Sequence, residues 1–237
     1  MEMYQKLANY YDLLVKDEEA TQSWVHFIQQ HAKFQDVFEC ACGSGEITLA
    51  LARLGYQVEA SDLSQAMIDQ AMQKKDAENV VFHVLDMVHF ETEKKRDLVL
   101  CLCDSLNYLL EEHQIQSFLQ SSYNSLKNEG TLIFDVHSLD RLQEFEEEFL
   151  EEGTLNGVNY EWDIQSDGDC IYQNFVFFDD EANASYEQHI QRVYNPQWLR
   201  QEAERIGFNV EIYTDFEHQG IVAGEKYFYV CRKGVQR

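Results

Sequence analysis

Short apolar runs alternate with helical patterns along the chain from residue 37 onward. The apolar runs resemble buried strands, and the segments between them carry apolar residues every three or four positions. Such alternation is typical of βαβ units, so the sequence predicts an α/β fold with a doubly wound, mostly parallel sheet and helices on both faces. The predicted strands cover residues 37–42, 57–61, 80–84, 97–103 and 131–136, and the predicted helices cover residues 46–54, 64–74 and 111–126.

The pattern changes after the fifth predicted strand. Apolar residues recur at helical spacing from Leu139 to Phe149, with glutamates over the remaining surface, which predicts an amphipathic helix. Three strand-like runs follow, separated by turn-forming residues, and they predict an antiparallel meander. Residues 138–193 then form an insertion, either a lid over the site or an oligomer interface. The three runs cover residues 159–165, 170–178 and 185–194.

The end of the chain returns to the earlier pattern. Pro196 stands at the first position of a predicted helix that reaches Ile206, and Gly207 follows as its stop signal. Two strands are predicted after it, at 209–214 and 226–232. With a single proline and no Gly/Ser-rich linker, residues 1–237 are expected to form one domain.

Charge narrows the range of partners. The chain carries 18 basic and 43 acidic residues, a formal net charge of -25. Such a field repels phosphate backbones, so it disfavours nucleic acid as a partner and suits a neutral or cationic small molecule, although solubility alone also explains it. The oligomeric state stays open.

No segment approaches the roughly 18 uncharged apolar residues of a membrane helix, and residues 1–20 lack the pattern of a signal peptide. We therefore expect a cytoplasmic protein without a membrane partner. Cys40, Cys42, Cys101 and Cys103 lie in apolar runs at C-x-C spacing, where thiols behave as small hydrophobes. Zinc sites usually bring Cys pairs on turns at wider spacing, so no metal is predicted.

The first predicted strand leads into a glycine-rich turn, Glu39-Cys40-Ala41-Cys42-Gly43-Ser44-Gly45-Glu46. Small residues there let a ligand approach the backbone beside a helix N-terminus. A dinucleotide site would need a third glycine where Glu46 or Thr48 stands, and an acid facing a pyrophosphate would repel it. Glu39 instead suits a ligand with an ammonium group. S-adenosylmethionine has both an ammonium and a sulfonium, so charge favours this cofactor over NAD.

Two further acids follow strand ends. Asp62 closes the second predicted strand and suits ribose hydroxyls, although it could also cap the next helix, a role for which Ser64 is better placed. Asp86 follows the third strand and could accept from an adenine amino group, although alone it would be read as a turn residue. Together with Glu39, these acids line the crevice where open α/β sheets bind ligands.

On these residues the chain resembles the class I (Rossmann-like) S-adenosylmethionine-dependent methyltransferases. Residues 39–45 look like the family's acidic-x-Gly-Cys-Gly-Thr-Gly loop, with Ala41 in place of the first glycine; Asp62-Leu63-Ser64 resembles the ribose segment and Asp86-Met87 the adenine segment. The resemblance implies a seven-stranded sheet with an antiparallel insertion after the fifth strand. It implies cofactor contacts from Glu39, Ala41, Gly43, Gly45, Asp62, Leu63, Asp86, Met87 and Cys103.

A closer resemblance is to small bacterial methyltransferases of unassigned substrate. It is carried by Tyr10-Tyr11-Asp12, by residues 103–108 and by Phe134-Asp135-Val136-His137-Ser138. Some small-molecule N-methyltransferases likewise insert antiparallel strands as an active-site cover. The resemblance implies the enzyme class and does not name the methyl acceptor. The candidate substrate-binding residues are Tyr11, Asn107, Tyr108 and, from the meander, Trp162. The aromatic side chains among them, with Tyr160 and Tyr172, could form a cage for a cation or could be packing residues.

Methyl transfer from a sulfonium is an in-line displacement, so alignment and exclusion of water matter most. Where the acceptor must lose a proton, His137 and Asp104 at strand ends are the candidate catalytic residues, with a structural role for His137 as the alternative. The predicted function is methyl transfer to nitrogen or oxygen of a small molecule. A non-catalytic adenosylmethionine-binding regulator, an RNA methyltransferase and an NAD-dependent dehydrogenase are the alternatives.

Overall fold

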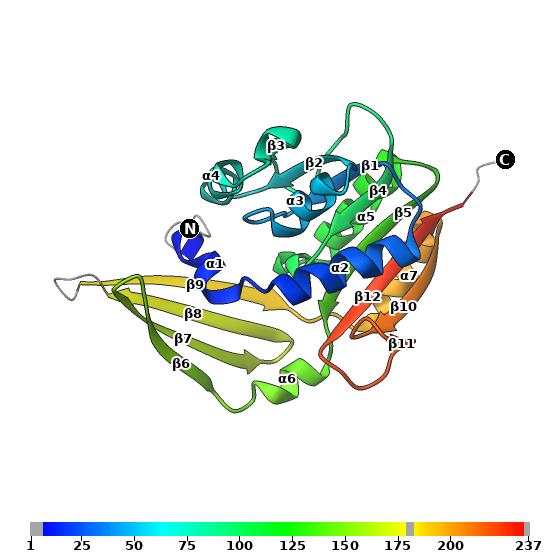
Figure 1. The fold of residues 1–237 in the computed structure, drawn as a ribbon. Coiled ribbons are helices and arrows are strands. Elements are labelled where there is room, and N and C mark those ends of the chain that lie inside the picture. The colour runs from blue at the N-terminus through cyan, green and yellow to red at the C-terminus, as the bar shows by residue number, and fades with distance from the viewer. Residues whose placement is uncertain (1–6, 179–182, 235–237) are drawn as a thin grey trace.

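The core of the molecule is a sheet of parallel strands joined by helices (Figure 1). The computed structural model describes residues 7–178 and 183–234. From β1 (Asp36–Cys40) the chain first adds β2 and β3 on one side of β1, and then adds β4 and β5 on its other side. The strand order therefore reverses between β1 and β4. Such a switch point creates a crevice at the carboxyl ends of the strands. The parallel strands lie in the order β5 (Leu126–His137), β4 (Arg96–Cys101), β1 (Asp36–Cys40), β2 (Gln57–Asp62), β3 (Val81–Val84).

Beyond β5 the sheet continues with antiparallel pairing. β12 (Lys226–Lys233) pairs with both β5 and β10 (Phe208–Thr214), and the two-residue β11 (His218–Gln219) extends the edge. The α/β, doubly wound, mostly parallel fold is therefore confirmed. β11 makes an eighth strand beside the seven expected, because a two-residue pairing leaves no pattern in the sequence.

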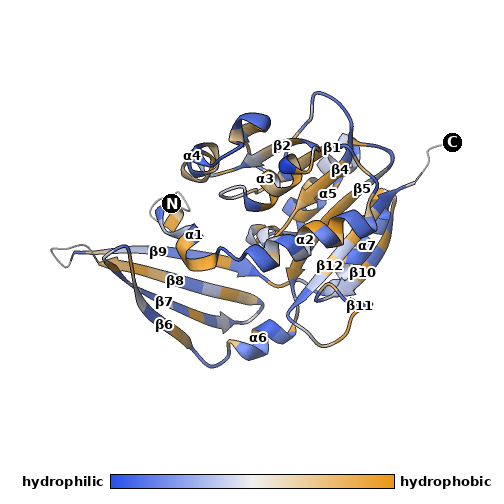
Figure 2. Ribbon diagram, in the orientation of Figure 1, coloured by the Kyte–Doolittle hydropathy of each residue, from blue (hydrophilic) through white to orange (hydrophobic). Residues whose placement is uncertain are grey.

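Helices cover both faces of this sheet. α2 (Glu18–His31) and α3 (Glu46–Arg53) bury their apolar residues on one face, and α5 (Glu112–Ser125) and α7 (Pro196–Ile206) do so on the other. Successive strand residues point to opposite faces: Leu100 packs with the first pair of helices and Cys101 with the second. Strands buried on both faces carry continuous hydrophobic stretches, such as residues 98–101 of β4 and 132–134 of β5, and Figure 2 shows such stretches in the central sheet.

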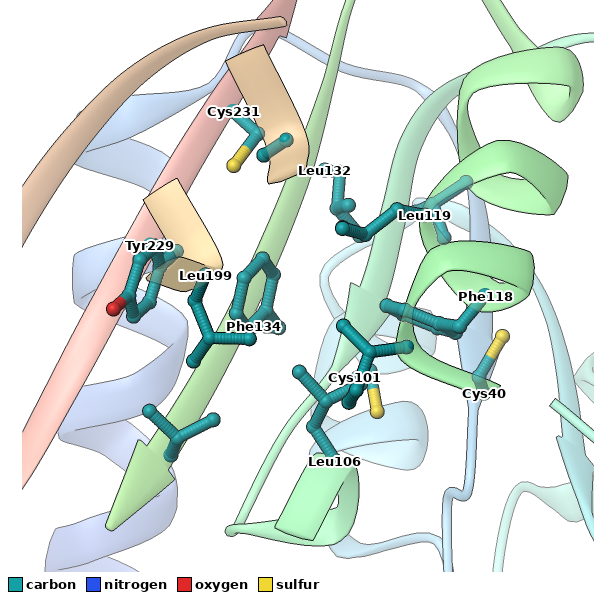
Figure 3. Packing of buried hydrophobic residues seen from close by; sticks show 14 of the residues in the cluster. Cys40, Cys101, Leu106, Phe118, Leu119, Leu132, Phe134, Leu199, Tyr229 and Cys231 are labelled. Carbon is teal, nitrogen blue, oxygen red and sulfur yellow. The ribbon is translucent and has the colours of Figure 1, made fainter. Parts of the chain in front are cut away.

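The face beneath α5 and α7 shows how tightly this core is packed. The Phe134 and Tyr229 rings of β5 and β12 stack with centroids 4.6 Å apart. Phe118 and Leu199 approach the same layer from the two helices (Figure 3). All four side chains are buried, so each contributes roughly 1.5 to 3 kcal/mol of hydrophobic stabilisation. This rigid layer holds the strand ends that carry the site.

Residues 138–193 form a second, antiparallel sheet, but the predicted helix there is wrong in extent. Helix α6 is short (Asp140–Glu144), and Phe149 begins a strand that the local pattern did not reveal. This edge strand is half solvated, and it forms through pairing with β7, so its own periodicity is weak. The strands lie in the order β6 (Phe149–Leu155), β7 (Val158–Asp167), β8 (Cys170–Phe178), β9 (Ala184–Arg192).

The N-terminal segment packs on this second sheet. The turn η1 (Leu7–Asn9) and helix α1 (Tyr11–Val15) lie over its β9 side in Figure 1. Leu7 joins the buried cluster of Phe175 and Phe177, and the Tyr10 ring stacks on Phe177 with centroids 5.0 Å apart. The segment therefore bridges the two sheets above the crevice. The remaining elements are α4 (Gln65–Gln73), η2 (Ala77–Asn79) and η3 (Ser105–Tyr108).

Candidate functional site

The loop between β1 and α3 folds through left-handed backbone conformations. Ala41, Gly43 and Gly45 have φ angles of 51°, 54° and 80°. Such angles cost little for glycine and more for alanine. At Gly45 space is also limited, since a Cβ there would lie 3.2 Å from the Cβ of Ala71. The loop thus brings bare backbone to the N-terminus of α3.

Glu39 lies beneath this loop and is almost fully buried. The Thr48 hydroxyl donates a hydrogen bond to its Oε2. Burial raises the pKa of Glu39 to about 7. The hydrogen bond from Thr48 opposes this rise, and the nearby Asp62 carboxylate adds to it. The side chain is therefore an acid whose ionisation depends on a cationic partner.

Asp62 connects β2 to the glycine loop. Its Oδ2 accepts from the Gly43 N–H at 2.8 Å and its Oδ1 from the Ser64 N–H at 2.8 Å. Burial raises the pKa of Asp62, against the effect of these backbone donors. Ser64 caps α4, as expected, by accepting from the Met67 N–H. Asp62 therefore fixes the loop as well as facing the crevice.

A large cavity joins the three acids. Its volume is about 1150 Å³, ample for an adenosine-sized ligand together with a small acceptor. Asp86, whose Oδ1 accepts from the Val88 N–H at 2.9 Å, stands in its wall beside Met87. Of the predicted site residues, the lining includes Glu39, Ala41, Gly43, Asp62, Leu63, Asp86, Met87, Cys103, Tyr11 and Tyr108.

The other predicted residues lie behind this lining. Gly45 stands at the start of α3, and Trp162 stacks on Phe175 within the second sheet, with ring centroids 5.2 Å apart. Asn107 is fully buried and joins three elements, because its amide donates to the Arg192 carbonyl and accepts from the His137 N–H. Asp104 and His137 are adjacent, with His137 Nε2 3.6 Å from Asp104 Oδ2.

Asp104 belongs to a partly buried charge cluster that the sequence did not reveal. The Lys226 ammonium bonds to Asp104 and lies 3.4 Å from Asp135 Oδ2. Burial alone would raise the pKa of Asp104, but Lys226 outweighs it and holds that pKa below the usual value. Burial raises the pKa of Asp135 to about 7 and lowers that of His137. Asp104 is the ionised carboxylate of the group.

The inner face of β9 supplies further buried polar residues. Glu187, His189 and Gln191 alternate along the strand and all three are buried. Gln191 contacts both His137 and the Asp104 carbonyl. A strand that buries polar side chains at every second position is a signal for a site, although in the sequence of the meander the aromatic residues are the more prominent feature. Lys226, by contrast, lies 122 residues from Asp104 and no local pattern indicates the pair.

The rim of the cavity is closed by charges around α1. Asp12 accepts from the Ser44 hydroxyl and lies 2.5 Å from the Lys74 ammonium, which also pairs with Glu46 at 2.6 Å. These contacts tie α1 to α3 and α4, next to the glycine loop. Within residues 7–178 and 183–234, no group of three or more His, Cys, Asp or Glu side chains is placed to hold a metal ion. No helix in these ranges is long and apolar enough to cross a membrane.

This fold is the class I fold of S-adenosylmethionine-dependent methyltransferases. An S-adenosylmethionine-dependent methyltransferase from Clostridium acetobutylicum superposes with a TM-score of 0.83 over 98% of this chain and 99% of its own, at 24% identity. The sugar N-methyltransferase KedS8 from Streptoalloteichus superposes with a TM-score of 0.77 over 95% of this chain and 93% of its own, at 19% identity.

Sequence comparison leads to the same class. Residues 37–130 match the family described as "Methyltransferase domain". The protein named "Putative methyltransferase GWCH70_2453" of Geobacillus sp. (strain WCH70) is 30% identical over 97% of this chain and 99% of its own length. The glycine/sarcosine N-methyltransferase of Aphanothece halophytica is 25% identical over 76% of this chain and 69% of its own length. The chain belongs to the S-adenosylmethionine-dependent methyltransferases.

Proposed function

We propose that this enzyme transfers a methyl group from S-adenosylmethionine to a nitrogen or oxygen atom of a small molecule. One observation carries the proposal: a single cavity of about 1150 Å³ runs from the acids at the strand ends to Tyr11 and Tyr108 beneath the second sheet. Cofactor and acceptor can therefore meet in one continuous cavity, where they can be aligned for an in-line displacement. Sugar and glycine/sarcosine N-methyltransferases among the similar proteins support a nitrogen acceptor.

The residues present fit the cofactor. The buried Glu39 carboxylate suits its ammonium, Asp62 its ribose hydroxyls, and Asp86 with the Met87 backbone its adenine edge. Ala41, Gly43 and Gly45 leave the backbone open, while Leu63 and Cys103 add contact area. When bound, S-adenosylmethionine supplies a methyl group on a sulfonium. The chain's residues orient it and exclude water.

For the acceptor we assign the end of the cavity nearest β5 and β9. Asp104 lies just behind the lining, where Lys226 keeps it ionised, and it orders the polar groups at this end of the cavity. Burial favours neutral His137, which positions Asp104. Tyr11 and Tyr108 form the aromatic wall, with Asn107 holding η3 and Trp162 supporting the sheet behind it. Residues 138–193 then act as a lid and substrate wall.

The test is a screen of small amines, amino acids, amino sugars and hydroxylated metabolites with methyl-labelled S-adenosylmethionine, with tRNA alongside. We expect label in a small-molecule product. The net charge of -25 disfavours tRNA, since phosphate contacts need basic side chains. Label in tRNA and in no small molecule would overturn the proposal in favour of an RNA methyltransferase.

A further inference from the structure

Tyr108, His189 and Glu187 form a continuous hydrogen-bonded chain from the cavity into the second sheet. The Tyr108 hydroxyl lies 3.2 Å from His189 Nδ1, and His189 Nε2 lies 3.0 Å from Glu187 Oε1. Tyr108 lines the cavity, whereas His189 and Glu187 are buried. One end of this hydrogen-bonded chain therefore faces the cavity, and the other end lies inside the protein.

The carboxylate fixes which imidazole nitrogen accepts a proton. An ionised Glu187 can only accept, so His189 Nε2 carries the hydrogen and Nδ1 presents its lone pair to Tyr108. The Leu7 N–H donates to Glu187 Oε2 at 3.2 Å and holds the carboxylate in place. The imidazole meets the rings of Phe175 and Tyr108 edge to face, with centroids 5.6 and 5.8 Å away. The histidine is thus held in one orientation.

We propose that Tyr108, His189 and Glu187 are the proton relay that deprotonates the methyl acceptor, with Tyr108 as the group that touches it. This role deepens the proposed function and rests on it. A tyrosine, a histidine and a carboxylate in this order make an acid–base system because the imidazole takes the proton and the carboxylate stabilises the resulting cation. The inserted sheet then contributes catalytic machinery as well as a wall.

The N–H or O–H bond of the acceptor breaks, and its proton goes to the Tyr108 oxygen while the Tyr108 proton moves to His189 Nδ1. His189 becomes an imidazolium paired with Glu187. The acceptor lone pair forms the new bond to the methyl carbon, and the electrons of the broken carbon–sulfur bond stay on sulfur. His189 loses its extra proton to water when the product leaves.

Other titratable groups surround the entrance of the relay. Tyr11 from α1 lies within electrostatic range of Tyr108, Cys103, Asp104 and Lys226. Burial raises the pKa of Tyr11, so its hydroxyl stays protonated beside Tyr108. On β8, His189 faces Gln173, which is uncharged, and Phe175. On β9 itself, Glu187 pairs with the imidazole, with Glu187 Oε1 3.0 Å from His189 Nε2.

The first experiment measures the imidazole itself. In wild-type protein with S-adenosylhomocysteine bound, NMR of isotope-labelled histidine should show the His189 hydrogen on Nε2 and an unprotonated Nδ1. In Glu187→Leu the imidazole loses its acceptor at Nε2 and should become a mixture of the two tautomers. His83→Asn removes a histidine outside the cavity, and this control should leave the His189 signals unchanged. A hydrogen on Nδ1 in wild-type protein would overturn the relay.

The second experiment compares pH profiles of kcat/KM for an acceptor from the small-molecule screen. Tyr108→Phe and His189→Asn should each lose about a hundredfold near neutral pH. The deficit should shrink as pH rises and the acceptor loses its proton to solvent, with the KM for S-adenosylmethionine unchanged. The matched control His83→Asn should follow wild type.

The outcomes separate the two proposals. A loss of activity that is equal at all pH values would show that Tyr108 and His189 only shape the pocket, and the relay would fail while the proposed function stands. If wild-type protein methylates no small molecule in the screen, the proposed function fails and the relay with it. Folding of each variant is checked by circular dichroism, and Glu187→Leu provides an independent variant if His189→Asn does not fold.

Discussion

Ala41 holds a backbone conformation that a side chain disfavours, at the entrance of the cofactor loop. Its φ of 51° lies in the left-handed region, where the Cβ crowds the neighbouring carbonyl. The similar loops of the family carry glycine at this position, so the chain forms the same turn at a cost in conformational energy. The Asp62 bonds to Gly43 and Ser64 help to hold the loop closed despite that cost.

Ala41→Gly should therefore stabilise the folded protein. Removing the Cβ relieves the left-handed strain, and we expect the free energy of unfolding to rise by about 1 kcal/mol in urea denaturation. Ala52→Gly in α3 is the control and should lower it by roughly 0.5 to 1 kcal/mol, because glycine is unfavourable inside a helix. A destabilised Ala41→Gly protein would contradict this account of the loop.

Glu39 makes stability depend on pH. Unfolded, it ionises near 4.5, whereas burial keeps it protonated up to about 7 in the folded protein. The folded state binds more protons in that interval, so its stability falls as the pH rises from 4.5 to 7 and changes no further above. At about 1.4 kcal/mol for each pH unit, the loss is roughly 3 kcal/mol.

Glu39→Gln should remove this part of the pH dependence. The free energy of unfolding of both proteins is measured by denaturation without cofactor at pH 5 and pH 7.5. Between these two pH values, wild type should lose a few kcal/mol of stability relative to Glu39→Gln. Cofactor affinity should show the opposite trend in wild type, since the ammonium favours ionised Glu39. Identical pH dependence in both proteins would mean that Glu39 stays ionised throughout.

The helices and strands whose conformation is determined by their own residues were predicted well from the sequence. β1, β2, β4 and the capped helices α4 and α7 follow from apolar runs, Ser64 and Pro196. β6 depends on pairing with β7, and the glutamates in its sequence obscured the strand pattern. The signal that could have revealed it is Asn156-Gly157, a two-residue loop whose φ angles are 50° and 87°, as a hairpin turn of this kind requires.

The same distinction holds for the site. Glu39 and Asp62 lie at the carboxyl ends of β1 and β2, and Asp86 lies just after β3, so the βα pattern alone placed them at one edge of the sheet. Lys226 reaches Asp104 through the antiparallel pairing of β12 with β5, and His189 reaches Tyr108 from another sheet. Contacts of this kind depend on tertiary pairing that a single sequence does not display.

At the element scale, residues 138–193 should be separable from cofactor binding. Most proposed cofactor residues lie on β1, β2 and the loops after them, whereas this segment supplies Glu187 and His189 to the acceptor side. Replacing the segment with a short loop should abolish methyl transfer and preserve much of the affinity for S-adenosylhomocysteine in calorimetry. A deletion that converts an oligomer into an active monomer would instead identify the segment as an interface.

The net acidic charge of the whole molecule and the acids of the ligand site favour the same kind of ligand. The net charge of -25 is accompanied inside the cavity by Glu39, Asp62 and Asp86, so the interior also favours positive charge. At the N-terminus of α3, Glu46 is held by Lys16 and Lys74. A pyrophosphate at that helix end would be repelled by the carboxylates of Glu46 and Asp12 and would have to compete with them for Lys16 and Lys74. The molecule therefore favours a cationic cofactor over a dinucleotide.

S-adenosylmethionine and S-adenosylhomocysteine should stabilise the protein against heat, and NAD should have no effect. A ligand that binds only the folded state adds about 2.7 kcal/mol at one hundred times its dissociation constant. For a chain of this size that corresponds to a rise in Tm of roughly 5 to 10 °C. Differential scanning fluorimetry at matched ionic strength measures it, with adenosine as a control because it lacks the ammonium that Glu39 is expected to bind. Adenosine should produce a much smaller shift. A rise in Tm with NAD and none with S-adenosylmethionine would contradict the electrostatic argument for the whole site.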